Sequence, residues 1–409
     1  MKQLTIVACA LICLLLESSS AGLAASGYPA NRHIVVPAQV RLVHGPAFNA
    51  SLNARPVSSD TSLSEDAVTY QITPTHTGMI DGPTTKLPFS IKWTAPVGQS
   101  STYPVMANGR VFVGGTDVFA LNAVTGATLW SKATPSIGLA FDHDMLFNLS
   151  GGGQLAAFVP STGVQLWFNS LPGQYAFSSP PAAGNGMVYT GGAGSGGTVY
   201  GVNETNGNLV WTASVENGDD SSPVVTSTGV YVSYVCPQAY DFAPLTGALI
   251  WHYSGPCEGG GGATAVLYRG SLYTESWASS PPGLILRATD GSPLGTFNSL
   301  VTPAFAKGLG YFVENNNQSL VAVSTRTGNV KWTQTLSGDS YSVPPIVVTN
   351  TLSGDLVICA TSGGTLDIYD AKAGTPLQSL SLGGGAESGM AFSHGLLVVP
   401  SGNNVIGLK

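Results

Sequence analysis

The sequence predicts an all-β fold made of a repeated four-stranded unit, and three observations support this prediction. The chain of 409 residues carries 52 glycines and 26 prolines among short β-branched runs such as Val111–Val113, which is typical of many strands joined by tight turns. No long amphipathic helix is visible. A glycine followed four residues later by tryptophan recurs at Trp130, Trp167, Trp211, Trp251 and Trp332.

The repeat period identifies the architecture. Copies recur about every 35 to 45 residues, and each unit reads as a small-residue or proline start, a hairpin, further β-rich runs and a last strand with the aromatic residue. The units start near Tyr103, Ile137, Ser179, Ser222, Ala263, Thr302, Val343 and Ser388. This phasing gives roughly eight units of four strands.

The two ends of the repeat complement each other. The eighth unit stops at Lys409 after three strands, while an orphan strand, Pro88–Trp93, precedes the first unit. Because an open array would leave sheet edges unpaired, we predict an eight-bladed β-propeller of antiparallel blades whose N-terminal strand completes the C-terminal blade. The motif is degenerate in the fifth and seventh units, where Phe297 and Leu377 stand in place of tryptophan.

The repeated residues are expected to be structural. The turn glycine permits a positive φ, and the neighbouring threonine hydroxyl caps the turn. The tryptophan can then lie between adjacent blades. This docking role, with no ligand role, is assigned to Trp93, Trp130, Trp167, Trp211, Trp251 and Trp332.

The phrase Ala120-Leu-Asn-Ala-Val-Thr-Gly-Ala-Thr-Leu-Trp130 resembles the tryptophan-docking motif of quinoprotein-like β-propellers, the pyrroloquinoline quinone (PQQ) repeat superfamily. The resemblance covers about residues 88 to 409, and Asn122 stands where the family usually has Asp. It implies the fold more specifically than the function, because that superfamily includes dehydrogenases, an outer-membrane assembly lipoprotein and sensor domains.

Three ranges are predicted along the chain: a signal peptide over 1–24, a Ser/Thr/Pro-rich arm or linker over 25–86, and the propeller over 87–409. The apolar run from Leu4 to Leu16 is too short for a comfortable membrane span, so secretion or a periplasmic location is expected. Cys13 leaves lipid anchoring open as an alternative.

Charge excludes one class of partner. A formal net charge of -7 with only 15 Lys and Arg leaves little to neutralise a phosphate backbone, so we expect no nucleic-acid partner. A monomer that binds a protein or a small polar ligand at one propeller face is the expectation instead.

That face is predicted from loop positions. In a four-stranded blade, the loop between strands two and three lies on the same rim as the loop that enters the next blade. The rim collects Asp219, Asp220, Glu258, Glu275, Trp277, Glu314, Asp339, Tyr341 and Glu387. They are either solvated loop residues or acidic groups that converge on a cation or polar ligand. A disulfide between Cys236 and Cys257 is also expected there, with Cys359 left as a buried thiol.

No cofactor, metal site or catalytic residue is expected. As the resemblance implies, a dehydrogenase would bind PQQ, which carries three carboxylates, together with calcium or a lanthanide ion. The predicted funnel loops hold almost no Lys or Arg, since Arg269, Arg287 and Lys307 lie elsewhere in their units. His143 and His394 fall in predicted hairpin turns and are expected to be surface residues.

The leading hypothesis is therefore a secreted or periplasmic propeller that serves as a non-catalytic binding or protein-interaction scaffold. Two alternatives implied by the resemblance remain: a role like that of the outer-membrane protein assembly factor, and a PQQ-dependent oxidoreductase.

Overall fold

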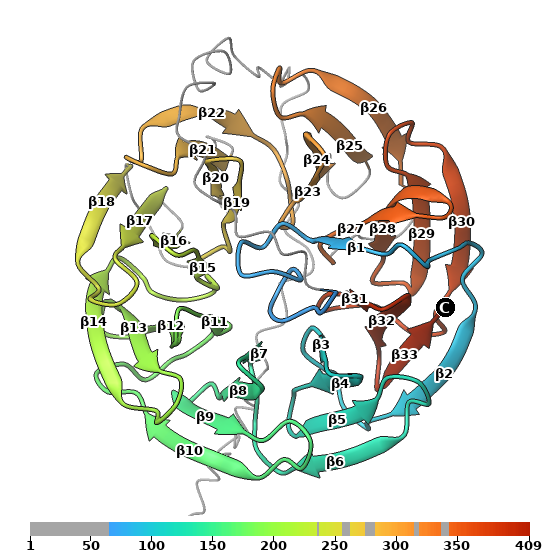
Figure 1. The fold of residues 1–409 in the computed structure, drawn as a ribbon. Coiled ribbons are helices and arrows are strands. Elements are labelled where there is room, and N and C mark those ends of the chain that lie inside the picture. The colour runs from blue at the N-terminus through green and yellow to red at the C-terminus, as the bar shows by residue number, and fades with distance from the viewer. Residues whose placement is uncertain (1–64, 235–236, 256–261, 275–282, 315–318, 337–342) are drawn as a thin grey trace, which may run out of the picture. The chain divides into compact units, whose positions relative to one another are not determined.

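The computed structural model describes residues 65–234, 237–255, 262–274, 283–314, 319–336 and 343–409. The chain divides into two compact units, Met1–Arg41 and Leu42–Lys409, and every described residue belongs to the second. The described residues form strands and turns, and none of them builds a helix that could cross a membrane. Their strands are arranged in eight sheets around a ring (Figure 1).

The first four blades follow one another along the chain, each from its innermost to its outermost strand. Blade 1 contains β3 (Val105–Ala107), β4 (Arg110–Val113), β5 (Val118–Asn122) and β6 (Thr128–Lys132). Blade 2 contains β7 (Gly138–Asp142), β8 (Met145–Leu149), β9 (Gln154–Phe158) and β10 (Gln165–Ser170). Blade 3 contains β11 (Ala182–Gly184), β12 (Met187–Ala193), β13 (Gly197–Asn203) and β14 (Leu209–Val215). Blade 4 contains β15 (Val224–Val225), β16 (Val230–Tyr234), β17 (Gln238–Phe242) and β18 (Leu249–Ser254).

The remaining four blades complete the ring. Blade 5 contains β19 (Val266–Tyr268), β20 (Ser271–Thr274), β21 (Gly283–Arg287) and β22 (Pro293–Phe297). Blade 6 contains β23 (Ala304–Ala306), β24 (Leu309–Glu314), β25 (Ser319–Ser324) and β26 (Val330–Thr335). Blade 7 contains β27 (Ile346–Thr351), β28 (Gly354–Ala360), β29 (Thr365–Asp370) and β30 (Pro376–Ser381). Blade 8 contains β31 (Ala391–Ser393), β32 (Leu396–Ser401), β33 (Asn404–Leu408) and, from the other end of the repeat, β2 (Ile91–Pro96).

The predicted closure of the ring is confirmed. Strand β2 pairs antiparallel with β33, in a register that sets Ile91 opposite Leu408 and Pro96 opposite Asn404. The orphan strand of the sequence is thus the fourth strand of blade 8. The eight-bladed propeller is confirmed with it.

The residues just before β2 lie inside the ring, although the sequence predicted an arm or linker there. Of the range 25–86, the structure describes residues 65–86, and these run through the middle of the ring, where Figure 1 shows them in blue. The short strand β1 (Met79–Asp81) joins blade 7 as a fifth strand, parallel to β27. We call residues 66–81 the central segment. A stretch without repeat or strong apolar pattern is therefore built into the propeller.

The central segment hydrogen-bonds to all eight blades at or beside their innermost strands. Taken from blade 1 to blade 8, the contacts are Ala67 N to Met106 O, Phe141 N to Val68 O, Thr69 Oγ1 to Pro181 O, Val225 N to Pro74 O, Leu267 N to Thr75 O, Phe305 N to Thr77 O, Val347 N to Gly78 O, and Ser393 Oγ to Asp66 Oδ1. Their donor–acceptor distances run from 2.7 to 3.4 Å. The segment thereby supplies partners for backbone groups of inner strands that would otherwise face the channel.

Each repeat tryptophan contacts the blade that follows its own. The indole Nε1 donates to a backbone oxygen of the next blade's outer turn, in the pairs Trp93 to Ala123, Trp130 to Pro160, Trp167 to Glu204, Trp211 to Pro244, Trp251 to Ala288 and Trp332 to Ala371. The turn glycine lies directly against the ring. An added Cβ at Gly247, for example, would be 2.5 Å from the Trp211 side chain.

The two degenerate units, in blades 5 and 7, differ in how the residue that replaces tryptophan packs. Phe297 of blade 5 is buried and packs against Phe312 of blade 6, with ring centroids 5.8 Å apart. Leu377 of blade 7 is instead 43% exposed. Its neighbour Gln378 exchanges two hydrogen bonds, each 2.8 Å long, with the backbone of Phe89 just before β2. A polar link thus joins blade 7 to the closing strand where the aromatic residue is missing.

We predict that Gly247→Ala destabilises the protein more than Gly98→Ala. Both glycines have a positive φ, +66° and +71°, so each substitution carries a backbone cost of about 1 to 2 kcal/mol. Only Gly247 faces an indole ring, while no atom lies within 4 Å of the Cβ position at Gly98. The clash at Gly247 should add about 1 to 3 kcal/mol, measured as the difference between the two variants in denaturant unfolding. Equal losses would show that the ring contact contributes nothing.

Candidate functional site

The centre of the propeller is occupied by buried residues of the central segment. Gln71 Nε2 donates to the carbonyl oxygens of Thr302 and Pro345, which lie on different blades. His76 is fully buried, with Nδ1 3.1 Å from Ala265 O and Nε2 3.4 Å from Ser222 Oγ. Burial lowers the pKa of His76 to about 4, so this imidazole is neutral at pH 7. The centre is therefore polar, hydrogen-bonded and without net positive charge from this histidine.

This centre does not fit PQQ. A ligand with three carboxylates needs cationic partners, and the central segment contains neither Lys nor Arg. Elsewhere in the described part of the chain, Arg110 donates to Asn108 O, Arg287 to Asp290 Oδ2 and Lys307 to Asp355 Oδ1. The central segment also hydrogen-bonds to backbone groups of the innermost strands, so these groups are not free to bind a ligand in the centre.

The predicted rim site is only partly within the described residues. Glu258, Trp277, Asp339 and Tyr341 lie outside them, as do Glu275, Cys236 and Cys257. Asp219 and Asp220 lie together on the connection between blades 3 and 4, and Glu387 is exposed on the connection between blades 7 and 8. Burial raises the pKa of Asp220, whose backbone N–H donates to Ser178 Oγ. Cys359 is a buried free thiol on β28.

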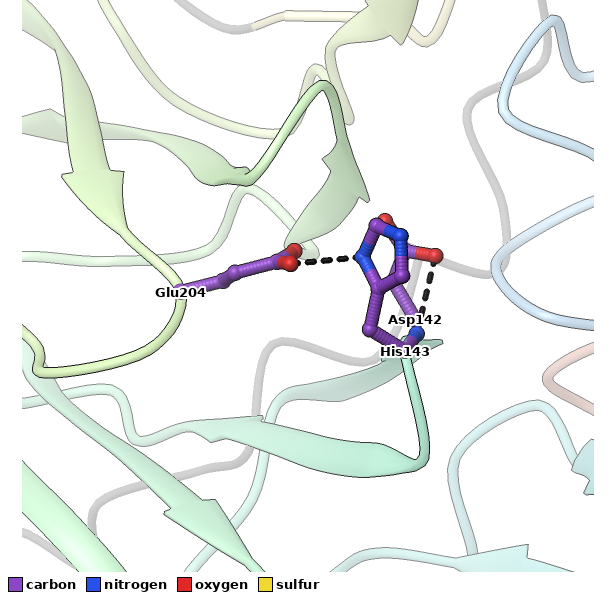
Figure 2. Close-up of side chains that lie close together, drawn as sticks. All are labelled: Asp142, His143 and Glu204. Atoms are coloured by element: carbon purple, nitrogen blue, oxygen red, sulfur yellow. Dashed lines mark hydrogen bonds and ion pairs between the residues drawn. The ribbon is translucent and has the colours of Figure 1, made fainter.

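A second polar group lies between blades 2 and 3 and is absent from the predicted sites. Asp142 ends β7, His143 occupies the turn to β8, and Glu204 follows β13 (Figure 2). His143 Nδ1 is 2.6 Å from Glu204 Oε1 and 3.4 Å from Asp142 Oδ2. One potential ligand atom from each residue lies within 4.8 Å of the other two. The expectation of His143 as a plain surface residue thus misses its contacts, although its side chain is 66% exposed.

The electrostatics of this group follow from its two carboxylates. The charge of Asp142, followed by that of Glu204, raises the pKa of His143. Burial, followed by repulsion from Asp142, raises the pKa of Glu204. Sequence reasoning could not bring these residues together, because His143 and Glu204 are 61 positions apart and belong to different repeats.

Comparison with known families decides the classification. The family model described as outer membrane protein assembly factor BamB matches residues 114–266 and 238–407. The chain belongs to this family of PQQ-repeat propellers. The predicted superfamily is confirmed by this match.

Solved structures similar to this BamB-family chain share its fold at low sequence identity. BamB from Moraxella catarrhalis aligns with a TM-score of 0.62 at 14% identity, over 78% of this chain and 99% of that one. Quinohemoprotein alcohol dehydrogenase from Comamonas testosteroni aligns with a TM-score of 0.68 at 13% identity, over 86% of this chain and 81% of that one. Europium-containing methanol dehydrogenase gives a TM-score of 0.64 at 14% identity, over 82% and 89%.

A curated relative with a named activity matches over a shorter stretch. Tetrathionate hydrolase from Acidithiobacillus ferrooxidans is 28% identical over 153 residues. The match covers 33% of this chain and 30% of the relative. The BamB-family chain thus spans less than a third of that enzyme's length in the alignment.

Glu314 is the residue of the predicted rim whose environment is most unusual among those described. It ends β24 and is only 4% exposed. Burial raises its pKa from 4.5 to about 7. Between these two values, the folded protein holds a proton that the unfolded chain has released.

We predict that, as the pH rises from 4.5 to 7, the parent loses stability relative to the Glu314→Gln variant. The buried His76, with its pKa lowered to about 4, acts in the opposite direction but is present in both proteins, so it cancels in this difference. The raised pKa limits the effect to about 3 kcal/mol, and above pH 7 the difference between the variant and the parent should level off. Denaturant unfolding at pH 4.5, 7 and 8.5 measures it. The exposed Glu387 provides a matched control, since Glu387→Gln should leave the pH profile unchanged. Parallel profiles of stability against pH for all three proteins would contradict the raised pKa of Glu314.

Proposed function

We propose that this protein is a secreted or periplasmic scaffold that binds another protein and has no catalytic centre of its own. The observation that carries the proposal is the central segment, which hydrogen-bonds to all eight blades and occupies the middle of the ring. Binding is then left to the outer surfaces. The match to the BamB family, whose description names an assembly factor, agrees with a role in protein interaction.

The outermost strands of blades 2, 3 and 4 provide a candidate surface for such a partner. Each carries apolar side chains that point away from its own blade core, and their exposed fractions lie between 36% and 57%: Leu166, Phe168, Leu209, Val210, Leu249 and Ile250. These strands lie next to one another on the circumference (Figure 1). Exposed apolar side chains on edge strands are a common feature of protein-binding surfaces. We call this the apolar edge.

The predictions about export are part of this proposal. A signal peptide over residues 1–24, an arm that begins after it, and a disulfide between Cys236 and Cys257 all suit an oxidising compartment outside the cytoplasm. They support an envelope partner. A small polar ligand at the rim of Asp219, Asp220 and Glu387 is the alternative to a protein partner.

We predict that the double variant Leu166→Ser/Phe168→Ser captures at least tenfold less partner protein than the parent from an envelope extract of the native host. These two residues supply exposed apolar area on β10 that association would bury. The matched control is Val330→Ser/Leu377→Ser, which makes the same kind of change on the outer strands of blades 6 and 7. Unchanged capture by the first variant, with folding intact, would rule out the apolar edge.

A second candidate function is suggested by the match to tetrathionate hydrolase: hydrolysis of a polythionate. We predict that the purified full-length chain consumes no tetrathionate. It should also show no dye-linked oxidation of alcohols or sugars after incubation with PQQ and calcium. Ion chromatography and dye reduction measure the two activities. Sustained turnover of tetrathionate would replace the scaffold by the hydrolase, and quinone-dependent turnover would show that the central segment can be displaced.

A further inference from the structure

The internal repeats provide a comparison that sets the Asp142, His143 and Glu204 group apart. The position whose carbonyl oxygen accepts from a tryptophan is Ala123, Pro160, Pro244, Ala288 or Ala371 in five outer turns, but Glu204 in blade 3. The repeat requires only a backbone oxygen there. The carboxylate of Glu204 is therefore not needed for the tryptophan hydrogen bond of the repeat.

The facing turn departs from the repeat as well. The first hairpins of several blades end in a glycine, as in Asn108-Gly109, Asn185-Gly186 and His394-Gly395. Blade 2 has His143-Asp144 instead, and both residues adopt a positive φ, 44° and 57°. Asp144 Oδ1 accepts from Asn108 Nδ2 of blade 1 at 2.8 Å. The turn that presents His143 is thus fixed by a neighbouring blade on its other side.

Glu204 is held rigidly and has an unused oxygen. Its N–H donates to Gly186 O at 3.1 Å, and its carbonyl oxygen accepts from Trp167 Nε1 at 2.6 Å. The residue is 4% exposed, Oε1 faces His143, and Oε2 is buried without a hydrogen-bond partner. A buried carboxylate oxygen without a donor costs free energy, and a bound cation would satisfy it.

We propose that Asp142, His143 and Glu204 bind a divalent first-row transition-metal ion such as Zn²⁺, through His143 Nδ1 and one carboxylate oxygen from each acid. Ligand atoms around tetrahedral zinc lie about 3.4 Å apart, given metal–ligand distances of about 2.0 to 2.2 Å. The distance from His143 Nδ1 to Asp142 Oδ2 is already 3.4 Å. The His143 ring, whose side chain is 66% exposed, would have to move away from Glu204 Oε1, which now lies 2.6 Å from Nδ1.

The donor set selects the class of ion. One imidazole nitrogen suits zinc and its first-row neighbours, whereas calcium and magnesium prefer sites built from oxygen alone. The two carboxylates supply a charge of −2 that balances the ion. Three protein ligands leave a position open toward solvent on the His143 side. The ion would also link blade 2 to blade 3. This inference is independent of the proposed scaffold role.

The test is calorimetric titration of the metal-free full-length protein with Zn²⁺, alongside Mg²⁺. We expect one zinc ion per chain and at least tenfold weaker binding of magnesium. His143→Ala and the isosteric Glu204→Gln should each weaken zinc binding at least tenfold. The matched control is His394→Ala, because His394 occupies the equivalent turn of blade 8 and contacts Glu65 and Asp66 through different ring nitrogens. This variant should bind zinc like the parent.

Melting temperature provides a second readout of zinc binding that does not rely on the heat of titration. Zinc should raise the melting temperature of the parent and of His394→Ala, and should leave that of Glu204→Gln unchanged. Zinc binding by His143→Ala and Glu204→Gln with unaltered affinity would overturn the site. So would the absence of one-to-one binding by the parent, which would leave His143 and Glu204 as a simple ion pair.

Discussion

The antiparallel pairing of β2 with β33 is the contact on which the rest of this propeller depends. It supplies the fourth strand of blade 8, and so it pairs an edge that would otherwise be open. It also fixes where the chain is immediately before β2. The preceding residues reach the closing strand from the centre of the ring, where the central segment contacts every blade in turn. The same continuous stretch of chain therefore fills the centre of the ring and then closes it.

The repeat gives most of the ring the same interface between blades. An indole N–H donates to a backbone oxygen of the next blade, and a glycine leaves room for the ring. Because the contact uses a backbone acceptor, the side chain at the acceptor position is free to vary. Glu204 uses this freedom without disturbing the hydrogen bond from Trp167. Chemistry can thus be added at one interface of the ring without cost to its geometry.

The sequence predicted the blades but neither the central segment nor the group of Asp142, His143 and Glu204, and the reason is the range of the interactions. Trp130, Trp211 and their turn glycines are separated by a fixed local spacing, which is visible in the sequence alone. The central segment has no such signal, because its burial rests on backbone hydrogen bonds to strands far along the chain. Its four threonines and one proline suggest a linker, yet Thr69 and Thr77 are buried.

By itself, the sequence determined the number of blades, the strand that closes the ring and the superfamily, since each follows from a period or an unpaired end. Only the tertiary structure decided what fills the centre and which polar residues meet. Asp142 and His143 come together with Glu204 because the curvature of the ring sets the inner hairpin of one blade beside the outer turn of the next. A local pattern cannot encode that meeting, since it depends on how the blades pack rather than on the spacing within any one of them.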